Sequence, residues 1–580
     1  MIDDPTRVEW RQWGDGAFTE AQASDTPVLL SLTASWCDSC REMDIETYAE
    51  PRIAANINEW FIPIRVDIDR HPRVRERYNM GGFPSTVFCT PTGKLLTGAA
   101  YLGPDGMRQV IDSVRSVWDK RGADAGRVPQ ALTDDPTPVG TIDERIESHL
   151  AGQLELKWDD RFAGWGDNAK FPLPRTVEFA LKRKQNQAIE TLHVIAESLY
   201  DHSTGGFYRY ADNRDWTTPH KEKILDTNAA LIRAFVNGYL YTGEETLLDP
   251  AYGTQQFFID QLWNGQAFGK SIAPQSESES KTAESEATVD ARRDLTAYAG
   301  SNALMADALL TLSAYTDDKT AYEYGSRVLG TLESTFIGDD GIVSHAGYDE
   351  TPGELNISSD TAHRTEIEDT DPSEPILLLE DHARVINAFV TARQVLGPDV
   401  NTLTNDPVLV ASVVADAAID ALSDANVNGD GDADADGAFR DGPTTGPGLL
   451  DRPLRPLDGA IEMADALLKL GRISDTDQYK TAATDALAAF AGARDRLGVQ
   501  VAGYGAVTAR VTRPLLFVRM GAEAGSDLHR AALRIADHEA IVIPSVTDIQ
   551  DGTAHLTRGS KTETATTPDE VMNAVSVLTD

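Results

Sequence analysis

The feature that most restricts the fold of this chain is a helical segment that recurs four times. The copies are TNAALIRAFVNGYL from Thr227, SNALMADALLTLSAY from Ser301, DHARVINAFVTARQVL from Asp381 and DGAIEMADALLKLGRI from Asp458. Each copy begins with a residue of the helix-capping type and continues with apolar residues at helical spacing. Their first residues lie 74, 80 and 77 positions apart, so each unit has room for two helices and two connections.

A ring of helical hairpins accounts for this repeat. The inner helices would be rich in small residues, and the Gly-aromatic turns STGGFYRY, WNGQAFGK and DADGAFRD would gather on one rim. A further helix pair at residues 174–202 brings the number of hairpins close to six. We therefore predict an all-α (α/α)6 toroid over residues 158–504, with an open helical solenoid as the alternative.

The residues before and after this region follow a different pattern. Residues 1–120 contain the apolar strand VLLSLT, a helical stretch, the strand FIPIRVDID and a hairpin around PTG, which predicts an α/β domain. Residues 121–157 are rich in Gly, Pro, Asp and Thr and are predicted to be a linker. Residues 505–580, starting with AVTARVTRPLLFVRM, predict strand, helix, strand and a short hairpin in a small α/β segment.

Cys37 and Cys40 are two of only three cysteines among the 580 residues. A zinc site needs about four ligands, and the sequence holds no second CxxC or CxxH, so neither a metal nor another cofactor is expected. Cys37 falls at a strand-to-helix turn, where free N–H groups and the helix dipole stabilise a thiolate. The pattern therefore favours a redox-active pair in which Cys37 attacks and Cys40 resolves. The third cysteine, Cys89, lies in the apolar strand TVFCT and is expected to pack in the core.

The chain is strongly acidic, with 92 Asp and Glu against 52 Lys and Arg and a formal net charge of −40. Such a chain repels nucleic acid and anionic lipid. An acidic surface of this kind suits a protein dissolved in molar salt, so we expect a halophilic cytosol. The N-terminus lacks the basic and apolar regions of a signal peptide, and no apolar run approaches the length of a bilayer span, so we expect a soluble cytoplasmic protein.

Three ordered motifs carry a family resemblance. WCxxC after a buried strand, VD on the next strand and GFPSTVF before a hairpin together resemble the thioredoxin fold, in which Pro84 would correspond to the cis-proline. CDSCREM, ETYAEPRIAANINEWFIPIRVD and GGFPSTVFCTPTGK resemble the thioredoxin-like domain of the spermatogenesis-associated protein 20 family more closely. The resemblance implies thiol-disulfide exchange at Cys37 and Cys40, with Trp36, Phe83 and Pro84 forming a substrate groove.

The chain also departs from that family. Asp38, Ser39 and Arg41 occupy positions where the family usually carries CHWCH, and Ser31 replaces the buried Asp of ordinary thioredoxins. If Cys40 needs a base, it would be Asp38, Asp44 or water. The carboxylate of Asp38 is expected to raise the pKa of the neighbouring thiol and make the pair more reducing.

The resemblance continues through WDDRFAGWGDNAKFPLP and HKEKILDTNAAL, where the family is similar to six-hairpin glycosidases and sugar epimerases. It implies a rim pocket for carbohydrate, with His220 as a candidate acid or base and Lys170 more simply paired with an acid. Thr227 and Ser301 replace an Asp and a Trp of the family, which weakens the case for sugar chemistry. Glycoside hydrolysis would also need two carboxylates that face each other. The candidate pocket residues are Lys170, His220, Glu222, Asp226, Asn228, Asp294, Asn302, Glu380 and Asp381.

Three hypotheses for the function stay open. The first is a thiol-disulfide oxidoreductase or redox-dependent chaperone that acts on protein thiols and disulfides and recognises them through the toroid. The second is a carbohydrate-active toroid with a redox regulatory domain, and the third is a non-catalytic binding module.

Two acidic segments resemble sites without meeting their requirements. Asp432, Asp434, Asp436 and Gly437 match a calcium loop, but Pro443 stands at its last ligand position, so a solvated loop is expected. SESESKTAESEATVD from Ser276 predicts a mobile acidic loop.

Overall fold

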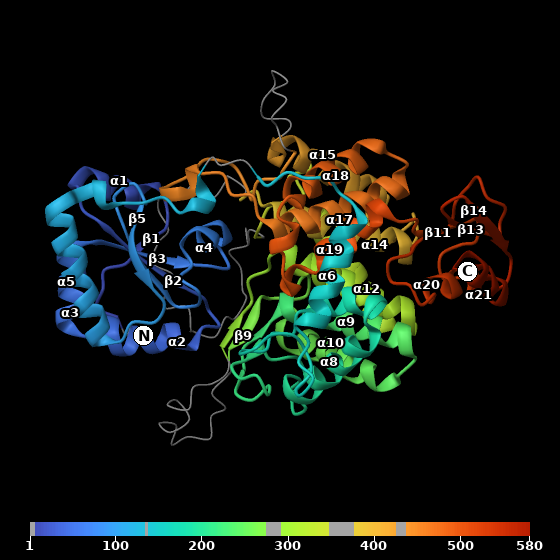
Figure 1. The fold of residues 1–580 in the computed structure, drawn as a ribbon, viewed down its shortest axis with the longest axis horizontal. Helices are drawn as coiled ribbons and strands as arrows, with labels where there is room; N and C mark the ends of the chain where they lie inside the picture. The colour runs from blue at the N-terminus through green and yellow to red at the C-terminus, as the bar shows by residue number, and fades with distance from the viewer. Residues whose placement is uncertain (1–5, 134–136, 274–291, 347–375, 425–436, 580) are drawn as a thin grey trace.

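The computed structural model describes residues 6–133, 137–273, 292–346, 376–424 and 437–579. Figure 1 shows three units along the long axis of the molecule: an α/β domain in blue, a body of helices, and a small α/β unit in red. A thioredoxin-like domain followed by a helical toroid and a small α/β unit is the predicted fold class, and it is confirmed.

The N-terminal domain is built on a five-stranded sheet in the order β1-β3-β2-β4-β5. The strands β1, β3 and β2 run parallel, while β4 and β5 run antiparallel to their neighbours. This strand order and the position of the dithiol after β2 define a thioredoxin-like fold. The strands are β1 (Arg11–Gln12), β2 (Val28–Thr33), β3 (Ile62–Asp67), β4 (Ser85–Cys89) and β5 (Leu95–Ala99).

Alternate residues of β2 enter two separate cores, as the period of a strand requires. Leu29 packs with residues of α3 and α5 on one face, whereas Leu30 packs with residues of α1 and α4 on the other. Cys89 lies fully buried in the second core, as expected from its apolar strand. The helices are α1 (Asp15–Ser24), α2 (Asp38–Met43), α3 (Pro51–Trp60), α4 (Pro72–Tyr78) and α5 (Pro104–Arg121).

The helical body is a closed ring. Each of its inner helices packs against the next, and the last one returns to the first. The four repeated segments of the sequence correspond to α9, α12, α14 and α17, and the closure rules out an open solenoid. The inner helices are α7 (Pro174–Arg183), α9 (Leu225–Thr242), α12 (Ala299–Thr316), α14 (Leu379–Val395), α17 (Leu457–Ser474) and α19 (Gly503–Thr512).

Each inner helix has an outer partner, and the sixth pair joins the two ends of the ring. The outer helix α6 packs against α19, which lies some 350 residues later in the chain. Residues 121–157 are therefore not a linker throughout, and residues 503–512 are helical where a strand was predicted. Local sequence patterns missed this pair because its helices are not consecutive. The outer helices are α6 (Glu144–Leu156), α8 (Gln185–Ser198), α10 (Leu248–Leu262), α13 (Lys319–Thr331), α15 (Pro407–Leu422) and α18 (Asp477–Ala491).

The C-terminal unit follows the predicted order of strand, helix, strand and hairpin, and a further helix ends it. Its sheet has the order β12-β11-β13-β14, and the helices α20 and α21 pack on this sheet around a separate core. The elements are β11 (Leu516–Met520), α20 (Asp527–Leu533), β12 (Ile541–Ile543), β13 (Ala554–Arg558), β14 (Lys561–Ala565) and α21 (Pro568–Thr579).

Candidate functional site

Cys37 and Cys40 lie where the buried strand β2 gives way to helix α2. The two residues form a disulfide, and Cys37 is the N-cap of α2. The backbone N–H of Cys40 donates to Sγ of Cys37 over 3.1 Å, so the helix start supplies a donor to the sulfur expected to act as nucleophile. This is the local arrangement that favours a thiolate.

The residues predicted to form a substrate groove lie beside this pair. The peptide bond between Phe83 and Pro84 is cis, as the resemblance implied. The rings of Trp36 and Phe83 meet edge to face with centroids 6.1 Å apart, and both belong to the apolar cluster that contains the two cysteines. The indole N–H of Trp36 donates to Asp69 over 2.7 Å, which fixes the orientation of the ring.

The rim of the toroid covers the dithiol. Ser35, Trp36 and Asp38, three neighbours of Cys37 in the chain, each contact a residue of the ring. Ser35 donates to Asp294 over 2.9 Å, Arg292 donates to Asp38 over 2.9 Å, and the guanidinium of Arg209 lies 4.4 Å from the centroid of the Trp36 ring. Both cysteines are consequently buried, with 5% and 4% of their surface exposed. Arg292 and Asp294 come from β10 (Arg292–Asp294), whose position the sequence did not predict.

A second row of polar contacts joins the domain to the mouth of the ring. His345 bridges the carboxylate of Asp381, 2.7 Å away, and the backbone carbonyl of Asp69, 2.8 Å away. Lys270 donates to Asp226 over 2.8 Å and lies 3.8 Å from the Asp69 carboxylate. These contacts place Asp69 between the ring and Trp36. Neither His345 nor Lys270 was predicted, although Lys270 ends the Gly-aromatic turn WNGQAFGK, because no local pattern indicates the distant carboxylates that the two side chains contact.

Helix α4 makes a buried polar contact with the ring. Arg77 forms ion pairs with Asp441 and donates to the backbone carbonyl of Leu449, while the hydroxyl of Tyr78 accepts from the N–H of Leu449. Leu449 and Leu450 of the ring belong to the same core as the inner strands of the N-terminal domain. The orange segment that reaches α4 in Figure 1 carries these residues. The domain is therefore docked firmly on the ring.

Most of the candidate pocket residues gather near this interface. His220 stacks on Tyr210 with ring centroids 4.2 Å apart and is bonded to Asp212, while Glu222 pairs with Arg209, the residue that covers Trp36. Asp294 contacts Ser35 directly. Asp226, Glu380 and Asp381 lie in the first turns of α9 and α14 at the mouth of the ring. The structure thus brings these residues toward the dithiol.

Three other candidates have structural roles instead. The amide of Asn228 accepts from the N–H of Phe207 and donates to its carbonyl, and Asn302 makes the same pair of bonds with Phe268. Each amide fastens a Gly-aromatic turn to the next inner helix. Lys170 is fully buried and donates to Asp159 over 2.9 Å, so the acid partner expected for it is Asp159. The polar atoms of these residues are therefore engaged in bonds inside the protein.

The carboxylates at the ring mouth are held by cations. Arg384 pairs with Glu380 and lies 3.8 Å from Asp226. Burial opposes ionisation of both acids, but nearby cations outweigh it and lower the pKa of each carboxyl. Lys270 and Arg384 have this effect on Asp226. Arg384 and Arg75 have it on Glu380. The general acid of a glycosidase needs a raised pKa instead, so neither of these two carboxyls suits that role.

The carboxylates considered as a base for Cys40 are also engaged. Asp38 accepts from Arg292, and Asp44 accepts from Arg65 on the neighbouring strand β3. A different carboxyl in this region has an altered affinity for protons: burial, with the nearby charges of Asp69 and Asp294, raises the pKa of Asp67 to about 7. Its Oδ1 accepts from the backbone N–H groups of Asp69 and Arg70.

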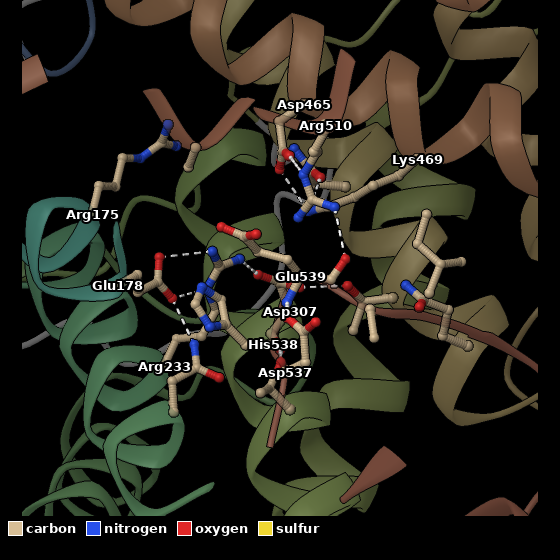
Figure 2. Close-up of a pocket in the computed structure, with 18 of the residues that line it drawn as sticks. Arg175, Glu178, Arg233, Asp307, Asp465, Lys469, Arg510, Asp537, His538 and Glu539 are labelled. Carbon is tan, nitrogen blue, oxygen red and sulfur yellow. Dashed lines mark hydrogen bonds and ion pairs between the residues drawn. The ribbon is translucent and has the colours of Figure 1, made fainter. Parts of the chain in front are cut away.

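A cavity of about 160 Å³ lies farther inside the ring, on the side of the C-terminal unit. Figure 2 shows that charged side chains dominate its walls. Arg233 pairs with Glu178 over 2.7 Å and with Asp307 over 2.5 Å, and Arg510 pairs with Asp465 over 2.8 Å. These pairs connect neighbouring inner helices, so the network ties the ring together from within. Sequence reasoning missed them, although a charge inside an apolar repeat such as LIRAF or MADALL was the available signal.

Several predictions fall on residues that the structure does not describe. These are the calcium-like residues Asp432, Asp434 and Asp436 and the acidic insertion from Ser276 to Asp290. Within the described ranges, no group of three or more His, Cys, Asp or Glu side chains is arranged to hold a metal ion. In the same part of the chain, no helix combines the length and apolar character needed to cross a bilayer.

Fold and site together define a protein with a thioredoxin-like domain whose dithiol faces the rim of a helical toroid. Residues 3–135 match the family model described as "Thioredox_DsbH: Protein of unknown function, DUF255". The chain is similar to human spermatogenesis-associated protein 20, with 28% identity over 296 residues. This match covers 44% of the chain and 37% of the human protein, so it spans little more than a third of that relative. The resemblance predicted from the sequence is confirmed.

Two further likenesses cover a smaller part of the chain or have a lower identity. The chain is 34% identical over 83 residues to thiol:disulfide interchange protein DsbD 1 of Pseudomonas aeruginosa, which is 14% of either protein. Among solved structures, a sugar epimerase from a ruminal bacterium superposes with a TM-score of 0.44 at 14% identity, covering 59% of this chain and 84% of that one.

Proposed function

We propose that this protein exchanges thiols and disulfides through Cys37 and Cys40. The observation that supports the proposal best is the position of Cys37 at the N-cap of α2, with the N–H of Cys40 directed at its sulfur. A helix start stabilises the thiolate, which is the form that attacks a disulfide. The similarity of 83 residues to a thiol:disulfide interchange protein agrees with this chemistry.

In the reduced protein, the Cys37 thiolate attacks one sulfur of a substrate disulfide. A mixed disulfide forms between Cys37 and the substrate, and the other substrate sulfur leaves as a thiolate and takes up a proton. Cys40 then loses its proton and attacks Sγ of Cys37, which releases the second substrate thiol and leaves the Cys37–Cys40 disulfide. The substrate gains two electrons, and a dithiol reductant must return two electrons to the pair before the next cycle.

The proposed substrates are proteins with accessible disulfides, and the proposed setting is a cytosol of high salt. The acidic composition supports the setting, since a net charge of −40 keeps a folded chain hydrated under such conditions. The toroid would limit access to the dithiol, because its rim lies over Trp36 and the two buried cysteines. A substrate therefore has to present its disulfide on a thin or extended segment.

The test combines an activity assay with a trap. The full chain is assayed for reduction of insulin by dithiothreitol at high KCl, beside Cys37→Ser as the matched control. Cys40→Ser is then expressed in a halophilic host, and the mixed disulfides that it retains are identified by mass spectrometry. We expect faster insulin reduction than with Cys37→Ser and proteins captured on Cys37. Equal rates for both proteins, with no capture above the Cys37→Ser background, would overturn the proposal.

A further inference from the structure

The ring contributes charged groups to the immediate surroundings of the dithiol. Asp38 follows Cys37 directly, and its carboxylate accepts from Arg292 of β10 over 2.9 Å. The two residues are 254 positions apart, so only docking of the ring brings this cation to the start of α2. In the sequence alone, Asp38 stands beside the nucleophile as a carboxylate that disfavours the thiolate.

Other charges near α2 are already balanced or lie on the helix itself. Arg209 covers Trp36 but is paired with Glu222 over 3.2 Å, and Arg65 is paired with Asp44. Asp294 accepts from the hydroxyl of Ser35. Among the described residues, Glu42 and Arg41 lie on α2 itself and Asp69 is bonded to Trp36. Arg292 is a cation that the ring places on the carboxylate next to Cys37.

We infer that Arg292 is a positioning residue for the exchange reaction, because it offsets the charge of Asp38 and so increases the fraction of Cys37 present as thiolate. The inference rests on the proposed function, since a larger thiolate fraction matters only if Cys37 attacks disulfides. It also revises the prediction made from Asp38 alone. With the ring docked, the dithiol is less reducing than an unpaired Asp38 would make it.

The pair is partly exposed, with 33% of the Arg292 side chain and 47% of the Asp38 side chain open to solvent. Its effect is therefore modest, and substitution of Arg292 leaves the buried contacts of α4 intact. Arg293 is the matched control, because it is an exposed Arg on the same strand and its side chain points to the opposite face.

The experiment measures the rate of Cys37 alkylation by iodoacetamide between pH 5 and pH 9 in the full chain carrying Cys40→Ser. Cys89 does not interfere, since it is fully buried and burial raises the pKa of its thiol. We expect Arg292→Gln to lower the rate at pH 7 about two- to threefold and to move the midpoint upward by about 0.3 to 0.5 pH unit. Arg292→Lys should retain most of the parent rate, and Arg293→Gln should match the parent.

A second background tests the role of Asp38. Because Asp38 holds Arg292 in place, Arg292→Gln should have little effect once Asp38→Asn is present. The inference is overturned if folded Arg292→Gln keeps the parent midpoint, or if its effect is as large in the Asp38→Asn background. Alkylation requires no exchange activity, so failure of the insulin assay sinks the proposed function separately from this result.

Discussion

Arg77 of the N-terminal domain and Asp441 of the ring form a bidentate ion pair inside the interface. The two guanidinium N–H groups donate to the two carboxylate oxygens over 2.5 and 3.1 Å. The Arg77 side chain is completely buried and donates to two backbone carbonyls of the ring as well. Removing one partner of a buried pair leaves the other charge without compensation, which costs more than an exposed pair contributes. The orientation of the dithiol toward the rim depends on this contact.

We expect Arg77→Met to lower the free energy of unfolding by about 3 kcal/mol, at the low end for buried pairs because Arg73 also lies 3.5 Å from Asp441. Urea denaturation at fixed KCl measures the change. Arg108→Met, which removes solvent-exposed contacts of Arg108 with Asp105 and Glu50, serves as the control and should cost less than about 1 kcal/mol. Similar values for the two variants would show that the α4 contact does not hold the domain.

The contact made by His345 is expected to depend on pH. Burial opposes the imidazolium, but the charge and the hydrogen bond of Asp381 outweigh it, so the pKa of His345 is raised above its ordinary 6.5. A raised pKa means that the stabilisation is complete below pH 6.5 and is lost as pH rises through the folded pKa. Asp381→Asn removes this charge, so the loss should begin at lower pH in the variant. The measurement is the free energy of unfolding from pH 5 to pH 9, and identical profiles for both proteins would contradict the prediction.

The carboxylate of Asp67 should destabilise the folded protein increasingly as the pH rises from about 4 to about 7. Its pKa of about 7 exceeds the ordinary 3.8, so its contribution to stability is complete below about pH 4 and is lost between pH 4 and pH 7. Asp67→Asn keeps an oxygen for the two backbone donors and carries no charge. Because the residue is partly exposed, we expect the variant to be more stable by about 1–2 kcal/mol at pH 8 and unchanged near pH 4. A gain of equal size at both pH values would contradict this assignment.

Asn302 is predicted to be a major determinant of ring stability. Asn302→Ala leaves the buried N–H and carbonyl of Phe268 without partners and should cost about 2–4 kcal/mol. Thr316→Ala, near the end of the same helix, removes a partly buried hydroxyl that donates to Leu312 and accepts from the N–H of Asp318, and it should cost only about 1 kcal/mol. Thermal unfolding followed by circular dichroism compares the two. Equal losses would mean that the amide does not fasten the turn.

The sequence was most informative where neighbouring residues determine the structure. The cysteine pair at a helix start and the four inner helices were predicted from local patterns, whereas the cis-proline was implied by the family resemblance. Asn228 and Asn302 were named only as candidate pocket residues, and their bonds to Phe207 and Phe268 were not predicted, because the sequence around an amide does not indicate which distant backbone atoms it will bond. Arg292 and the bridging role of His345 could not be foreseen, since Asp38 and Asp69, their partners in the N-terminal domain, lie more than 250 residues away in the chain.

The pairing of α6 with α19 bears on the order of events during synthesis. The ribosome makes α19 about 350 residues after α6. The outer helix α6 therefore has no inner partner to pack against during most of translation. Contacts between distant segments form slowly and leave apolar surface exposed in the meantime. The segment that docks on α4 is likewise made after three quarters of the chain. The nascent N-terminal domain therefore emerges with its dithiol uncovered, and its interface with the ring is completed only after Asp441 and Leu449 have been made.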